Sequence, residues 1–182
     1  MHFIETKLTG AFIIELESVI DHRGFFGRSF CVEEFKKHGL DLNPAQCNIS
    51  FNHKKGTLRG MHYQKTPKEE AKLVRCTRGA VYDVIIDLRL GSSTYCNWIG
   101  VELTESNYRA IFIPPGFAHG FQTLKDDSEL FYQMSTTYAP ECATGIRWND
   151  PLFKVRWPIQ TELTMSNKDL NYPDYMLKNI VS

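Results

Sequence analysis

Short strand-like segments separated by turns are the feature that most constrains the fold of this chain. Segments rich in Val, Ile, Phe, Tyr, Thr or Cys recur at residues 45–52, 57–64, 72–78, 80–88, 98–103, 109–113, 120–124 and 129–138. Between them lie clusters of Gly, Pro, Asn, Asp and Ser, which favour turns. Short strands at this spacing predict an all-β sandwich or barrel.

Helix signals are few. Residues 32–38 place Val32 and Phe35 on one face among charged residues, and Gly39 stands where the helix would end. A second short helix is expected after Ser166. With 182 residues and no repeat or linker, the chain is expected to form a single domain over 1–182, with a few short peripheral helices.

The charge balance and the apolar runs argue against two classes of partner. The chain carries 21 basic and 21 acidic residues, whereas nucleic-acid-binding proteins usually carry a basic excess. Its apolar runs are too short to span a bilayer, and its first residues lack the apolar core of a secretion signal. We therefore expect no nucleic-acid partner and no membrane partner.

The cysteines indicate a reducing compartment. There are five, and none forms a Cys-x-x-Cys pair. An odd number without a secretion signal predicts reduced thiols in the cytoplasm, mostly packed as small apolar residues.

Residues 56–64 hold the most informative pair of polar side chains. Arg59 and His62 are three residues apart, and residues an odd number apart in a strand normally point to opposite faces. Gly60 lies between them and allows a kink that could turn both toward one cavity. An imidazole beside a guanidinium is a proton carrier beside an anion-binding group. That pair suits a phosphorylated substrate that must lose a proton.

Four other residues are candidates for the chemistry, and three of them also have a structural interpretation. His119 follows a rigid proline–glycine turn and could meet His62 inside one barrel. Lys72 is either a solvated edge residue or a group that stabilises an oxyanion. Tyr132 either packs in the core or serves as a general acid in a cavity. Asp169 either caps a turn or orients a histidine.

A metal site is the competing use of the histidines. Barrels of the cupin type bind metal through a His-x-His pair, a nearby Glu and a later His, but the residue two after His62 is Gln64. Two histidines, His62 and His119, with a doubtful carboxylate from Glu69 or Glu70 would hold a transition metal poorly. We therefore expect no metal and no other cofactor.

A series of motifs runs in order through most of the chain. They are Asp21-x-Arg23-Gly24-Phe25-Phe26, Gln46-x-Asn48-x-Ser50, Gly56-x-x-Arg59-Gly60-x-His62-Tyr63-Gln64, Lys72-Leu73-Val74-Arg75, Asp83-Val84 with Asp87-Leu88-Arg89, Ile113-Pro114-x-Gly116-Phe117-Ala118-His119-Gly120-Phe121, Trp148-x-Asp150-Pro151 and Ser166-x-x-Asp169. Each is weakly specific alone, but in this order they resemble the dTDP-4-dehydrorhamnose 3,5-epimerase family. The resemblance implies a metal-free cupin jelly roll, usually a homodimer, that acts in nucleotide-sugar biosynthesis.

The resemblance also implies a reaction and its residues. The substrate would be a nucleoside-diphosphate 4-keto-6-deoxy sugar, whose C3 and C5 protons flank the C4 ketone. His62 would be the base, activated by Asp169. Lys72 would lie at the enolate oxygen, and Tyr132 would return a proton from the opposite face of the ring. Substrate binding would fall to Arg23 and Arg59 at the diphosphate, Tyr138 or Phe26 stacked on the base, and Gln46, Asn48, His119 and Lys168 around the pocket.

Two positions depart from the family pattern. The family often has an acidic residue where this chain has Arg28, and another where it has Ala143. In the family, the first carboxylate would accept a hydrogen bond from thymine N3–H, which a donor-only arginine cannot do. Either Arg28 donates to cytosine or guanine in a CDP- or GDP-sugar, or it turns away or binds phosphate and the substrate is still a dTDP-sugar.

Three functions therefore compete with the leading one, a carbohydrate epimerase acting at C3, C5 or both. They are an epimerase of a CDP- or GDP-4-keto-deoxy sugar, a non-catalytic sugar-nucleotide-binding cupin, and a metal-dependent cupin oxygenase. A pure binding protein has no need of an acid and a base, so His62 and Tyr132 together favour an enzyme.

Overall fold

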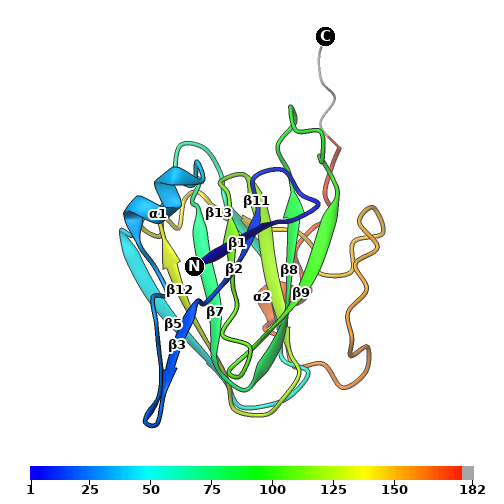
Figure 1. Cartoon of the computed structure of the whole chain (residues 1–182). Coiled ribbons are helices and arrows are strands. Elements are labelled where there is room, and N and C mark those ends of the chain that lie inside the picture. The colour runs from blue at the N-terminus through cyan, green and yellow to red at the C-terminus, as the bar shows by residue number, and fades with distance from the viewer. Residues whose placement is uncertain (178–182) are drawn as a thin grey trace.

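Two antiparallel sheets pack face to face in the computed structural model, which describes residues 1–177 (Figure 1). The first sheet contains, in spatial order, β1 (His2–Glu5), β2 (Phe12–Glu15), β10 (Ala110–Ile113), β7 (Lys72–Arg78), β12 (Ser128–Met134) and β5 (Gln46–Asn52). The second sheet contains β13 (Ala143–Gly145), β6 (Leu58–Gln64), β11 (Phe117–Thr123), β8 (Ala80–Asp87) and β9 (Trp98–Thr104). The expectation of an all-β sandwich is confirmed.

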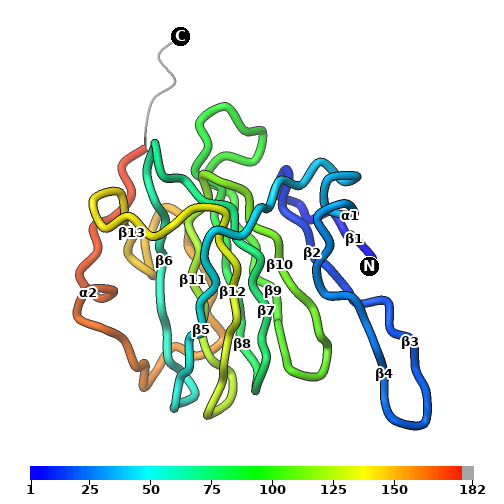
Figure 2. Tube along the Cα trace, turned by 90° about the vertical axis from the view of Figure 1, so that its left-hand side faces the viewer, coloured from blue at the N-terminus to red at the C-terminus, as the bar shows by residue number. Residues whose placement is uncertain are grey.

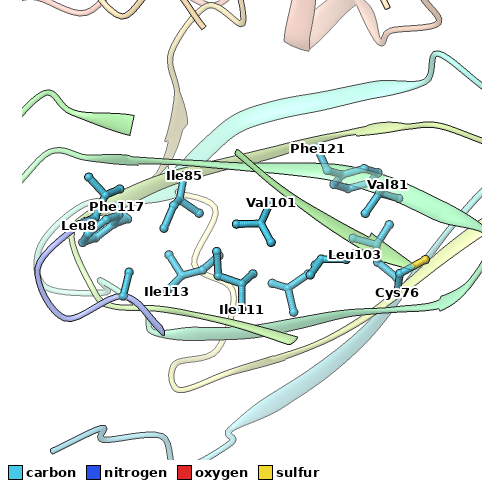
Figure 3. Packing of buried hydrophobic residues seen from close by; sticks show 13 residues of the cluster. Leu8, Cys76, Val81, Ile85, Val101, Leu103, Ile111, Ile113, Phe117 and Phe121 are labelled. Carbon is cyan, nitrogen blue, oxygen red and sulfur yellow. The ribbon is translucent and has the colours of Figure 1, made fainter. Parts of the chain in front are cut away.

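The main hydrophobic core lies between the sheets because alternate residues of each strand point inward. In β7, Val74 and Cys76 are buried in this core, whereas Leu73, the residue before Val74, belongs to a second cluster on the outer face. Figure 3 shows the inner cluster, in which the labelled side chains are Leu8, Cys76, Val81, Ile85, Val101, Leu103, Ile111, Ile113, Phe117 and Phe121.

The expected first helix, α1 (Val32–Lys37), covers the outer face of the first sheet. Its Phe35 is 1% exposed and meets the ring of Phe3 edge-on, with ring centroids 5.3 Å apart. Acidic residues occupy its first turn and basic residues its last, which complements the helix dipole. Gly39 follows the helix with a φ of +70°, a conformation that ends helices and that glycine adopts readily.

The chain after β13 covers the outer face of the second sheet. Phe153 and Trp157 are buried there against Leu58 and Val84. The expected second helix, α2 (Asn167–Leu170), follows this segment. The Ser166 Oγ atom caps it by accepting a hydrogen bond from the backbone N–H of Asp169. No helix in the described part of the chain has the length and apolar character needed to cross a bilayer.

A two-stranded hairpin projects away from the sandwich (Figure 2). It consists of β3 (Ser18–Asp21) and β4 (Gly24–Gly27). Its apolar side chains are exposed: Val19 is 69% exposed, Ile20 79% and Phe26 74%. Exposed apolar side chains gathered on one element are typical of interaction surfaces.

The observed strands differ from the predicted ones in that five short strands were missed and in where several strands begin or end. The strands β1 to β4 and β13 were not predicted, because each is only three or four residues long. The strand expected at 120–124 begins earlier, at Phe117, directly after the turn at Gly116, whose φ is +82°. The strand expected at 129–138 ends at Met134, because the chain bends at Ser135.

Candidate active site

One cavity, with a volume of about 540 Å³, is lined by residues of both sheets. The first sheet contributes Gln46, Asn48, Lys72 and Tyr132; the second contributes Arg59, His62 and His119; and later segments contribute Tyr138, Lys168 and Asp169. All of these were candidates on sequence grounds. The fold therefore brings together residues that are far apart in the chain.

A kink at Gly60 turns both Arg59 and His62 toward this cavity, as expected from the sequence. Gly60 has a φ of +133°, and the pairing register with β11 shifts at this point. The two backbones also approach closely, because a Cβ atom at Gly60 would lie 2.5 Å from the Cα atom of Gly120. Only glycine satisfies both the conformation and the close contact.

His62 forms a hydrogen bond with Asp169, with 2.6 Å between Nε2 and Oδ1. A carboxylate only accepts, so Nε2 of a neutral His62 carries the hydrogen and Nδ1 is left to accept a proton. Burial on its own raises the pKa of Asp169. Hydrogen bonds from His62, Ser166 and the Gly60 backbone, with the positive charge that His62 carries when it is protonated, outweigh burial and hold this pKa below its usual value.

Lys72 and Tyr132 lie on the opposite wall of the cavity. In the register of β12 with β7, Tyr132 pairs with Val74, so Lys72 two residues earlier points to the same face. Burial raises the pKa of Tyr132, and the charge of Arg59 opposes this only partly. The phenol of Tyr132 is therefore protonated at neutral pH and can donate a proton.

His119 is the cross-strand partner of His62 and has its own carboxylate. Its Nε2 atom lies 2.8 Å from Oδ2 of Asp83, which is fully buried. The other oxygen of Asp83 has no hydrogen-bond partner within residues 1–177. Asp83 thus fixes the orientation of the His119 ring.

The comparisons with known proteins agree on one family. A family model described as dTDP-4-dehydrorhamnose 3,5-epimerase matches residues 5–176. The chain belongs to this family.

Relatives and solved structures support this assignment over nearly the whole chain. The dTDP-4-dehydrorhamnose 3,5-epimerase of Methanothermobacter thermautotrophicus is 44% identical over 172 residues, which cover 93% of this chain and 92% of the relative. The crystal structure of the enzyme of that name from Elizabethkingia anophelis superimposes with a TM-score of 0.94 at 35% identity, covering 96% of each chain. An epimerase from Legionella pneumophila, solved in complex with dTDP-4-keto-L-rhamnose, gives a TM-score of 0.89 at 37% identity, covering 95% of this chain and 92% of that one.

The structure does not place three predicted residues in the cavity of this family member. Arg23, Phe26 and Arg28 all belong to the projecting hairpin or follow it, and none lines the cavity. Arg23 instead pairs with Asp21, and Arg28 donates to Glu34 of α1 at 2.7 Å. Within a single copy these three residues lie outside the cavity lining, and their role in substrate binding stays a prediction.

The structure also adds residues that the sequence interpretation missed. Asn52 is buried and its Oδ1 atom accepts a hydrogen bond of 2.8 Å from Nε of Arg59. A signal for Asn52 was present: Gln46, Asn48, Ser50 and Asn52 alternate along β5, which places all four on one face. Tyr172 packs edge-on against His62, with ring centroids 5.7 Å apart, and nothing in the sequence pointed to it.

Gln64 stands where metal-binding cupins place a second histidine, and its amide group has a structural role. Its nitrogen donates to the carbonyl oxygen of Lys68 at 2.7 Å, and its oxygen accepts from the backbone of Ala139 at 2.6 Å. Among residues 1–177, no group of three or more His, Cys, Asp or Glu side chains could hold a metal ion.

Proposed function

We propose that this protein is an isomerase that epimerises a dTDP-linked 4-keto-6-deoxy sugar at C3 and C5, the carbons beside the ketone. The observation that carries this proposal is the placement of acid and base. The His62–Asp169 pair lies on the wall formed by the second sheet, and Tyr132 lies on the facing wall formed by the first sheet. A ring bound between them would meet a proton acceptor on one face and a proton donor on the other.

The first step is removal of a proton from the carbon beside the ketone. His62 accepts this proton, and the carboxylate of Asp169 stabilises the imidazolium that forms. Removing the proton leaves an enolate, with its negative charge on the former ketone oxygen. The ammonium group of Lys72 stabilises that oxygen from the opposite wall.

The second step returns a proton from the other face. Tyr132 donates it, which inverts the carbon, whereas return from His62 would restore the original configuration. Once His62 has released its proton to solvent and Tyr132 has regained one from solvent, repeating the cycle at the second carbon would complete a double epimerisation.

The nucleotide end of the substrate is held by polar and aromatic side chains. Arg59, fixed by Asn52, suits the diphosphate because a guanidinium matches phosphate geometry. The exposed ring of Tyr138 is available to stack on the base. The remaining polar lining comprises Gln46, Asn48, His119 and Lys168.

Thymine is the base that we propose. Structures of the family have been solved with dTDP-4-keto-L-rhamnose and with TDP bound. Arg28, whose presence raised the possibility of cytosine or guanine, is engaged by Glu34 and lies outside the cavity lining. This arrangement favours the interpretation in which Arg28 turns away and the dTDP-sugar is retained.

We further propose a homodimer, in which the projecting hairpin packs against a second copy. Its exposed Val19 and Ile20 would be covered there, and the neighbouring Arg23 and Phe26 would be available to the partner's cavity. The edge strand β5 also exposes Ile49, at 66%, and offers an unpaired edge. We place this single-domain, metal-free enzyme in the cytoplasm, in keeping with its five unpaired cysteines.

Proton NMR in D2O tests the proposal directly. Incubated with dTDP-4-keto-6-deoxyglucose, the wild-type protein is expected to exchange the C3 and C5 protons for deuterium and to form the doubly inverted sugar. A protein that binds the nucleotide sugar without exchanging either proton would be a binding protein, and the proposal would be wrong.

A further inference from the structure

Glu70 is a buried carboxylate in the cavity wall that the mechanism above does not use. Its side chain is 4% exposed, and its Oε1 atom lies 2.8 Å from Nζ of Lys72. Its Oε2 atom is buried and has no hydrogen-bond partner in the described part of the chain. A buried carboxylate oxygen without a donor destabilises a fold, so stability alone does not account for this side chain.

The segment before β7 is held firmly, so the position of Glu70 is well defined. On one side, the carbonyl oxygen of Glu69 accepts a hydrogen bond from Oγ1 of Thr136 at 3.1 Å. On the other side, the backbone of Ala71 donates to Oγ of Ser135 at 2.8 Å and accepts from its backbone at 3.0 Å. Both neighbours of Glu70 are thus tied to the chain that follows β12.

The carboxylate of Glu70 fixes the position of the Lys72 ammonium group. A lysine ammonium is a point charge on a flexible stem with three donors, and on its own it occupies many rotamers. The Lys72 side chain is 10% exposed, and a buried ammonium needs a counter-charge. One donor to Glu70 satisfies that need and leaves two donors for the cavity.

We propose that Glu70 is a positioning residue, which holds the Lys72 ammonium where the enolate oxygen forms. The inference rests on the proposed function, because it assigns Glu70 a role through Lys72 in that reaction. In this role the carboxylate acts on the ammonium group of Lys72 and not on the substrate.

Glu70→Gln is the primary test, since glutamine keeps the shape and one acceptor oxygen but removes the charge. We expect kcat, and C3 and C5 deuterium exchange with it, to fall by about 10- to 100-fold, the size of effect that misplacing a catalytic group produces. KM and the affinity for dTDP should stay within about twofold of wild type, because the interaction acts in the transition state. Glu69→Gln is the same change one residue earlier, on an exposed residue. It should leave kcat, deuterium exchange, KM and the affinity for dTDP unchanged.

A double-mutant cycle separates positioning from an independent role. In a Lys72→Met background, Glu70→Gln should cost no further activity, because Glu70 acts only through Lys72. Equal losses in both backgrounds would overturn the inference. So would a Glu70→Gln variant with a raised KM and unchanged kcat, which would make Glu70 a substrate ligand.

Two controls keep the test decisive. If Glu70→Gln does not fold, Glu70→Asp takes its place, since it keeps the charge but withdraws it from Lys72; a loss of kcat supports the inference and an unchanged kcat overturns it. Wild-type exchange is measured first. A wild-type protein that exchanges no proton overturns the proposed function and this inference together, whereas an active wild type with fully active Glu70 variants overturns only this inference.

Discussion

Asp169 lies 2.6 Å from the Nε2 atom of His62, although 107 residues separate the two in the chain. The carboxylate is almost fully buried, whereas the imidazole is 42% exposed in the cavity. Asp169 is therefore the anchored residue of the pair, and His62 is the residue that faces the cavity.

Removing the imidazole should nearly abolish turnover. We expect His62→Ala to lower kcat by about 10²–10⁴-fold, the usual contribution of a positioned acid–base group. Deuterium exchange at C3 and C5, followed by proton NMR, measures the loss. Exchange at the wild-type rate would show that another group is the base.

Asp169→Asn tests whether the Asp169 carboxylate is needed for His62 to act as the base. An amide can present its nitrogen to His62 and favour the wrong tautomer; the corresponding change in a Ser-His-Asp triad costs about 10⁴-fold. We expect kcat to fall by at least about 10²-fold here. Asp174→Asn is the matched control, because Asp174 pairs with Arg147 away from the cavity. Equal activity of the two variants would argue against a role for Asp169.

Tyr132→Phe should separate proton exchange from inversion. His62 can still remove a proton and return it to the same face, so solvent deuterium should enter while the inverted product falls by about 10²-fold or more. Tyr82→Phe serves as the control, because burial raises the pKa of Tyr82 too, but the ring lies outside the cavity. Normal inversion by Tyr132→Phe would require another acid.

The raised pKa of Tyr132 also predicts a dependence of stability on alkaline pH. Its ordinary value is 10.0, and burial places the folded-state pKa above this. As pH rises, the unfolded chain releases the proton first, so the contribution to the free energy of unfolding is intact below about pH 10 and is lost above it. Urea unfolding between about pH 9 and 11 should show a smaller loss for Tyr132→Phe than for wild type. If the free energy of unfolding fell equally steeply with pH in both proteins, the raised pKa of Tyr132 would be contradicted.

The proposed dimer can be tested on the hairpin. We expect light scattering to show a wild-type dimer and Val19→Lys with Ile20→Lys to shift it toward monomer, because two charges would have to be buried. Ser18→Lys adds a charge to the same exposed strand without removing apolar surface and should leave the dimer intact. A monomeric wild type would leave Arg23 and Phe26 without access to any cavity.

Most of the strands that carry the site were predictable, because glycine- and proline-rich turns mark their ends and their residues favour strands. The hairpin was not, since its apolar residues face solvent and give no buried pattern. Pairing of Asp169 with His62 could be expected only from the family resemblance, because no local pattern links residues so far apart. Glu70 was visible only as a doubtful metal ligand, and its contact with Lys72 depends on how the preceding segment is tied down.

The close approach of Gly60 to Gly120 has a consequence for changing substrate specificity. A Cβ atom at Gly120 would lie 2.8 Å from the carbonyl oxygen of Arg59, so neither glycine tolerates a side chain. The spacing between the His62 and His119 strands is therefore fixed. A cavity reshaped for a larger or smaller sugar would therefore have to change on the opposite wall, which β5, β7 and β12 of the first sheet form.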